Sequence, residues 1–223
     1  EQPRFRRVAA VRFNYKALIG IGVTLMFTNI NANEITPNYT AGEKIAETCV
    51  SCHGANGVST NDLYPKLAGQ HQKYIRTQLY ELKRSYSDVD NGLRFDAEMS
   101  VEADKLSDQD IADLALFFSK QKTSYGTADQ GLAIRGEQIY RGGDIARGIP
   151  ACSACHSPTG QGNAAANYPA IAGQHAYYTE KQLNRFKTDE RRNDPARIMR
   201  DIAQRMTPAE IKEVSSYIQG LQP

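Results

Sequence analysis

The sequence has few cysteines, little net charge and no long hydrophobic run, and each of these absences excludes a class of protein. Only four cysteines occur among 223 residues, all within two short motifs, so none is left for a disulfide framework. The formal charge of +2 is too small to indicate nucleic-acid binding. The apolar run at residues 17–27 has eleven residues, whereas a membrane-spanning helix needs about 20. No stretch alternates with the period of a β-strand.

The first 32 residues are typical of a secretory signal. Five basic residues precede the apolar run, namely Arg4, Arg6, Arg7, Arg12 and Lys16. Polar residues and Ala32 follow the run, which completes the layout of a signal peptide. The alternative is a membrane anchor that stays attached to the chain. We therefore expect a periplasmic protein, either free or associated peripherally with the outer face of the inner membrane.

The rest of the chain contains two copies of one pattern, about one hundred residues apart. Residues 49–53, Cys-Val-Ser-Cys-His, return as residues 152–156, Cys-Ser-Ala-Cys-His. Residues 64–71, Tyr-Pro-Lys-Leu-Ala-Gly-Gln-His, return as residues 168–175, Tyr-Pro-Ala-Ile-Ala-Gly-Gln-His. Because the order of these segments is kept, the sequence predicts two copies of one domain.

Each copy is predicted to begin and end with a helix. Ser107 and Thr207 each stand three residues before an acidic residue, which is the signature of a capped helix start. Apolar residues then recur at helical spacing, so both closing helices should pack on a core. Opening helices are predicted near residues 41–48 and 132–140, just before each cysteine motif. Together these signals predict an all-α fold.

We expect the two domains at residues 38–122 and 130–223, joined by a polar linker at residues 121–130. Domains of this size bury little apolar surface, so each needs something further to fill its core. The halves also differ in charge, with a net charge of −4 for residues 33–122 and +2 for residues 123–223. Opposite charges suggest that the two halves dock different protein partners by electrostatic steering.

The two Cys-x-x-Cys-His motifs are typical of covalent haem attachment. Two thiols can reach the two vinyl groups of a haem, and the adjacent imidazole can ligate its iron. A zinc ribbon is disfavoured because its cysteine pairs usually lie about 15 to 20 residues apart, and a thioredoxin-like pair would need a βαβ context. The sequence predicts two haem c groups, attached at Cys49, Cys52, Cys152 and Cys155 and ligated by His53 and His156.

The second axial ligand of each iron could be methionine or histidine. The repeated residues of these types outside the leader and the haem motifs are Met99 and Met199, and His71 and His175. A further methionine, Met206, matches Leu106 of the first copy and is interpreted as an apolar core residue. Each member of the favoured methionine pair follows a polar loop and precedes a capped helix. The histidine pair is the alternative.

Proline follows each haem-motif histidine at a similar distance, at Pro65 and Pro169. A proline carbonyl at this place could accept a hydrogen bond from Nδ1 of the histidine and so orient the ring toward a metal. An ordinary turn proline explains the residue equally well.

Taken together, these features resemble the class I cytochrome c fold and, more closely, the two-haem cytochromes of the c4 type. The resemblance covers roughly residues 39–221 and rests on both haem motifs, both Tyr-Pro-x-(Leu/Ile)-Ala-Gly-Gln-His segments, and Asn-Asp-Pro at residues 193–195. It implies a helical domain around each haem and the ligand pairs His53 with Met99 and His156 with Met199. It also implies an electron carrier rather than an enzyme, passing single electrons in a respiratory chain from a membrane-bound donor complex to a terminal oxidase or similar acceptor.

The two copies also differ from each other. Gly54 follows the first haem motif and Ser157 the second, and the second copy has extra residues at 142–150. Two other functions stay open. One is a cytochrome subunit of a larger oxidoreductase, anchored by a retained leader, and the other is a two-haem peroxidase-like or sulfur-oxidising enzyme with an open iron site. No carboxylate or nucleophile cluster in the sequence demands catalysis.

Overall fold

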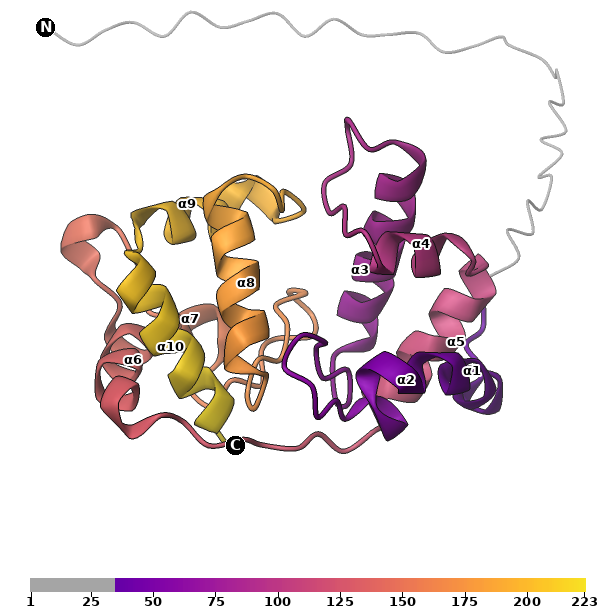
Figure 1. Cartoon of the computed structure of the whole chain (residues 1–223), viewed down its shortest axis with the longest axis horizontal. Helices are drawn as coiled ribbons and strands as arrows, with labels where there is room; N and C mark the ends of the chain where they lie inside the picture. The colour runs from indigo at the N-terminus through magenta and orange to yellow at the C-terminus, as the bar shows by residue number, and fades with distance from the viewer. Residues whose placement is uncertain (1–34) are drawn as a thin grey trace, which may run out of the picture. The chain divides into compact units, whose positions relative to one another are not determined.

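Helices account for nearly all the regular structure of residues 35–223, the part of the chain that the computed structural model describes. The predicted signal at residues 1–32 lies outside the described residues. Figure 1 shows two helical halves, with α1 to α5 in the first and α6 to α10 in the second. Between residues 35 and 223 the only β-structure is a pair of isolated bridges, so the predicted all-α class is confirmed. No helix in this part of the chain has the length and apolar character needed to cross a membrane.

The first half contains five α-helices: α1 (Tyr39–Ala46), α2 (Val50–His53), α3 (Gln72–Ser87), α4 (Met99–Asp104) and α5 (Asp108–Ser119). The second half repeats them as α6 (Gln130–Gly142), α7 (Ser153–His156), α8 (Ala176–Lys187), α9 (Ile198–Arg205) and α10 (Pro208–Gly220). Short 3₁₀ turns, η1 (Glu47–Cys49), η2 (Ala55–Gly57), η3 (Ile145–Arg147) and η4 (Pro195–Arg197), lie between them. Residues 120–129 connect the halves without a helix.

The opening and closing helices of each half cross at a glycine. A Cβ atom on Gly42 of α1 would lie 2.1 Å from the carbonyl oxygen of Asp113 in α5, and one on Gly136 of α6 would lie 2.2 Å from that of Glu213 in α10. Both predicted capping boxes are present at the starts of α5 and α10. The same close helix pair therefore frames each half.

Each half has its own hydrophobic core. The first is built mainly from α5, including Leu114 and Phe118, and the second from α10, including Val214 and Ile218. Met206 is 2% exposed within the second core, as expected for an apolar packing residue. The extra residues of the second half form a loop closed by a bridge between Asp144 and Ile149, and the Ile149 side chain is buried in the same core.

Candidate functional site

Each cysteine motif ends in a single helical turn, α2 or α7, and the first cysteine of each motif is the N-cap residue of that turn. The two cysteines of a motif stand three residues apart in helical backbone and so lie on one side of the turn. All four thiols are free and partly exposed. The two pairs belong to different halves of the protein, and between residues 35 and 223 no three His, Cys, Asp or Glu side chains are grouped as in a zinc site. Each half instead offers two adjacent thiols for bond formation with one ligand.

The histidine that ends each motif is held by a proline carbonyl. Nδ1 of His53 lies 2.9 Å from the carbonyl oxygen of Pro65, and Nδ1 of His156 lies 3.0 Å from that of Pro169. The carbonyl can only accept, so Nδ1 carries the proton and Nε2 keeps its lone pair. Burial lowers the pKa of both histidines, which favours the neutral ring that metal ligation requires. The two prolines are therefore more than turn residues.

The two candidate methionines occupy corresponding positions. Met99 is the first residue of α4 and Met199 the second residue of α9, and both are half-buried. An aspartate stabilises each helix start. Asp96 Oδ1 accepts the Met99 backbone N–H at 3.1 Å, and Asp194 accepts both the backbone N–H and Nε of Arg200, at 3.0 and 2.7 Å. Each methionine thus extends from a helix whose first turn is fixed.

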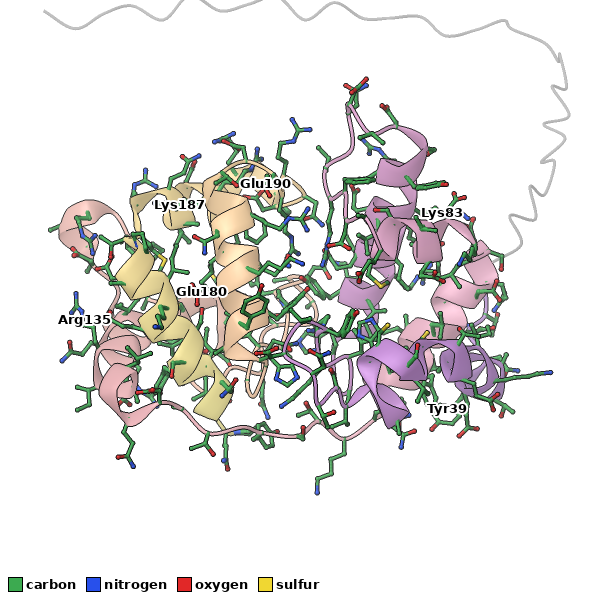
Figure 2. All side chains as sticks on the ribbon, in the orientation of Figure 1. Tyr39, Lys83, Arg135, Glu180, Lys187 and Glu190 are labelled. Carbon is green, nitrogen blue, oxygen red and sulfur yellow. The ribbon has the colours of Figure 1, made fainter. Side chains whose placement is uncertain are left out.

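A lysine fixes the other end of each methionine helix. Nζ of Lys83 donates to the carbonyl of Leu106, after α4, and Nζ of Lys187 donates to the carbonyl of Met206, after α9, at 2.7 Å. In Figure 2, Lys83 lies where α3 meets α4, and Lys187 lies where α8 meets α9. The positive charge of a lysine at a helix C-terminus also interacts favourably with the helix dipole. Sequence reasoning missed this pair, although both lysines occupy the same position in the repeat.

The alternative histidines lie where the two halves meet. They immediately precede α3 and α8 as the N-cap residues of those helices. Nε2 of His175 donates to the carbonyl of Ser59 in the other half at 3.0 Å, and burial together with the nearby Lys66 lowers the pKa of His175. Nε2 of His71 is buried and has no hydrogen-bond partner among the described residues.

The repeated segments also exchange hydrogen bonds across the junction of the halves. The Gln70 amide accepts the Ala170 N–H at 3.0 Å and donates to the Ala170 carbonyl at 2.8 Å. The Gln174 amide does the same with Lys66, at 3.0 Å for both bonds. Ala170 and Lys66 hold one position of the repeat, so the exchange is nearly twofold symmetric. The repeated Gln-His was the signal for this contact, but sequence reasoning used it only to define the repeat.

The residues present in each half fit a covalently attached haem. Two free thiols stand beside an imidazole whose Nδ1 is already engaged by a proline carbonyl. Nε2 of His53 is buried and, within residues 35–223, has no hydrogen-bond partner. A buried, oriented and neutral imidazole of this kind is suited to ligate a metal.

Comparisons with known proteins agree with this chemistry. The cytochrome c family matches this chain twice, at residues 39–122 and 133–222. The chain is 42% identical over 207 residues to a cytochrome c4 of Pseudomonas aeruginosa, covering 92% of this chain and 98% of that protein. It is 36% identical over 185 residues to a thiosulfate dehydrogenase electron acceptor of Thiomonas intermedia, covering 81% and 82%. The crystal structure of reduced recombinant cytochrome c4 from Pseudomonas stutzeri matches with a TM-score of 0.82 and 43% identity, covering 84% of this chain and 100% of that one.

Proposed function

Because this chain belongs to the cytochrome c family and is a dihaem electron-transfer cytochrome of the c4 type, we propose that it carries single electrons in a respiratory chain to a terminal oxidase or similar acceptor. It acts in the periplasm as a carrier rather than as an enzyme. The observation that supports this proposal best is the duplicated site, in which two thiols and one oriented histidine occur in the same arrangement in both halves.

We assign the iron ligands as His53 with Met99 and His156 with Met199, with the four motif cysteines as attachment points. A haem held by these residues would supply the redox chemistry, which is the uptake and release of one electron at its iron. A methionine sulfur from Met99 or Met199 would raise the potential of the iron and would leave no open position for a substrate. This ligand set suits a carrier of electrons better than a peroxidase.

The chain's own residues hold the candidate ligands of each site in place by hydrogen bonds. Pro65 and Pro169 fix the imidazole rings through Nδ1. Lys83 and Lys187 fix the helices that carry the methionines. Fixed ligands reduce the rearrangement that accompanies each change of iron charge, and the protein contributes orientation and electrostatics rather than bond chemistry.

An absorption spectrum of the oxidised protein tests the ligand assignment. Methionine bound to ferric haem gives a weak red band, and we expect that band in this protein. Replacing Met99 and Met199 one at a time should remove about half of the band each time, and replacing both should remove it. A band that persists in the double variant would overturn the assignment. Absence of the band from the wild-type protein, which is expected if His71 and His175 are the ligands, would do the same. Cyanide binding to the resting protein would favour the enzyme.

The opposite charges of the two halves support separate docking surfaces for an electron donor and an electron acceptor. A donor attracted to the positive half and an acceptor attracted to the negative half would each be steered at rates that depend on salt. Reversing charges on one half should therefore change the reaction rate, and its salt dependence, with only one of the two partners. Equal effects on both partners would contradict this part of the proposal.

One relative suggests a further electron donor for this chain. The Thiomonas intermedia protein is an electron acceptor for thiosulfate dehydrogenase and is 36% identical to this chain. This chain could serve a similar enzyme, with the same haem sites and the same carrier role. Mixing the oxidised protein with thiosulfate and a thiosulfate dehydrogenase should then reduce both haems, whereas a carrier restricted to other donors would stay oxidised.

A further inference from the structure

Two arginine side chains are buried together between the halves of the protein. Arg94 precedes α4 and Arg191 precedes α9, and the two residues are 8% and 5% exposed. Within residues 35–223 neither guanidinium forms an ion pair with an aspartate or a glutamate. Two positive charges therefore share an interior without a negative partner from the described chain.

The hydrogen bonds of these arginines cross from one half to the other. Nη2 of Arg191 donates to the Tyr74 hydroxyl and to Gln78 Oε1, both on α3 and both at 2.9 Å. Nη2 of Arg94 donates to the Tyr178 hydroxyl on α8 at 3.2 Å. The two tyrosines are equivalent in the repeat, so each half holds the arginine of the other in a similar way.

Every guanidinium nitrogen of Arg191 has a neutral partner, since Nε donates to Asn193 and Nη1 to Gln182, but no partner of either arginine carries a negative charge. Nη1 of Arg94 is buried and has no hydrogen-bond partner among the described residues. Burial and the nearby charge of Arg191 lower the pKa of Arg94, because both disfavour its positively charged form. Arginine nevertheless stays protonated in proteins. A buried charge without a counter-charge is strongly unfavourable, so this site is suited to bind anions.

We propose that Arg94 and Arg191 bind the propionate carboxylates of the two haems, in one site built from both halves. This inference rests on the proposed function, because it takes two attached haems as given. Each haem carries two carboxylates, and the planar guanidinium matches a carboxylate with two parallel hydrogen bonds. The unpartnered Nη1 of Arg94 is a donor for such a bond.

Because each arginine contacts a tyrosine of the other half, a change at this site should affect both haems. Tyr74 and Tyr178 hold the arginines in place, so the counter-charge of the propionates depends on the docking of the halves. Removing one arginine leaves a propionate without its partner, which makes the surroundings of the iron more negative and stabilises the ferric state. The reduction potential of a haem should then fall.

Infrared spectroscopy of the attached haems tests this assignment directly. The full protein would be prepared with ¹³C-labelled haem propionates, and the difference spectrum between its oxidised and reduced forms recorded. We expect Arg94→Gln and Arg191→Gln to shift the labelled carboxylate bands and to lower the potential of at least one haem. Arg191→Lys keeps the charge but loses the planar pair of donors, so it should also shift the bands while sparing the fold.

Arg192→Gln is the matched control. Arg192 lies beside Arg191, but its Nη2 donates to the carbonyl of Gly92 at 3.0 Å, so its loss removes the same charge without a carboxylate partner. It should leave the labelled bands in place. Bands that are unchanged in Arg94→Gln, Arg191→Gln and Arg191→Lys would overturn the inference, whether the arginines bind a solvent anion or none. A wild-type protein without two attached haems would instead refute the proposed function.

Discussion

The residue after each haem-motif histidine has the same unusual backbone conformation in both halves. Gly54 has φ 74° and ψ 168°, and Ser157 has φ 67° and ψ 159°. This region is nearly restricted to glycine, and a side chain there costs about 1 to 3 kcal/mol. A Cβ atom on Gly54 would also lie 2.2 Å from the carbonyl oxygen of Val58. We therefore expect Gly54→Ala to lower the free energy of unfolding by more than this strain alone.

Ser157→Ala is the matched control for this prediction, because position 157 already accommodates a Cβ atom. It removes the hydrogen bond from the Gln161 N–H to Ser157 Oγ, at 3.0 Å, which is worth about 1 kcal/mol, and a longer contact of 3.5 Å with the Thr159 hydroxyl. Denaturant unfolding followed at the haem band would compare the two variants. Equal losses of stability would show that the backbone conformation at Gly54 does not require glycine.

Glu210 makes the second half sensitive to acid. Arg147 holds the pKa of this buried carboxyl down at about 2, with help from the Thr207 N–H and hydroxyl, although burial opposes the shift. A carboxyl with a lowered pKa adds stability above its unfolded pKa of about 4.5 and loses it as the pH falls toward 2. We expect this contribution to be on the order of 2 kcal/mol at neutral pH, because Arg147 is partly exposed and screened.

Unfolding of Glu210→Gln from pH 7 to pH 2 would measure this contribution. The gap in stability between wild type and variant should be full at neutral pH and close between about pH 4.5 and pH 2. Glu213→Gln is the control, because it makes the same substitution at another glutamate of α10, and it should show no such gap. A gap that stays constant with pH would mean that Glu210 acts through its shape in the helix cap rather than through its charge.

At the scale of elements, the lysines at the ends of α3 and α8 are expected to control the methionine helices. Lys187→Met keeps the aliphatic length but removes the donor to Met206, so the end of α9 should loosen. The red methionine band should then weaken, and a lower denaturant concentration should suffice to displace the methionine. Lys181→Met on the exposed face of the same helix removes an equal charge and should change neither property. An intact band in Lys187→Met would leave the lysine with a purely packing role.

Helices with local signals could be predicted from the sequence, and helices that depend on the other half could not. Ser107 and Thr207 located the starts of α5 and α10, and the two opening helices were found within about two residues. The sequence reading did not identify α3 or α8 as helices. The buried face of α3 includes Gln78, which receives hydrogen bonds from the second half, so an apolar period of 3.6 residues is interrupted there.

In the candidate site, too, some parts could be predicted from the sequence and others could not. Cys-x-x-Cys-His placed two thiols and an imidazole in five neighbouring residues, and the sequence alone was enough to infer a haem. The role of Pro65 could not be decided until the fold brought its carbonyl to His53. The contact of Arg191 with Tyr74 spans 117 residues, and no local pattern specifies such a pair. The haem attachment was therefore readable from sequence, whereas the surroundings that tune it were not.

At the scale of the whole molecule, the glutamine exchange should couple the unfolding of the two halves. Gln70 and Gln174 each form two hydrogen bonds with backbone atoms of the opposite half, worth about 1 to 3 kcal/mol per glutamine. We expect Gln70→Ala or Gln174→Ala to weaken this coupling, so that calorimetry shows two transitions, or a calorimetric enthalpy above the van 't Hoff value. Gln161→Ala, on an exposed loop, should leave a single transition.

The near symmetry of the hydrogen bonds formed by Gln70 and Gln174 allows a second test of this prediction. The partner atoms belong to the backbones of Lys66 and Ala170, so the two glutamine variants should weaken the coupling by similar amounts despite the different side chains. Lys66→Ala keeps the backbone pair and removes only the bonds from Nζ to the carbonyls of Gly173 and Ser124, at 2.8 and 3.0 Å. If Lys66→Ala separated the transitions and both glutamine variants did not, the lysine rather than the repeated glutamines would join the halves.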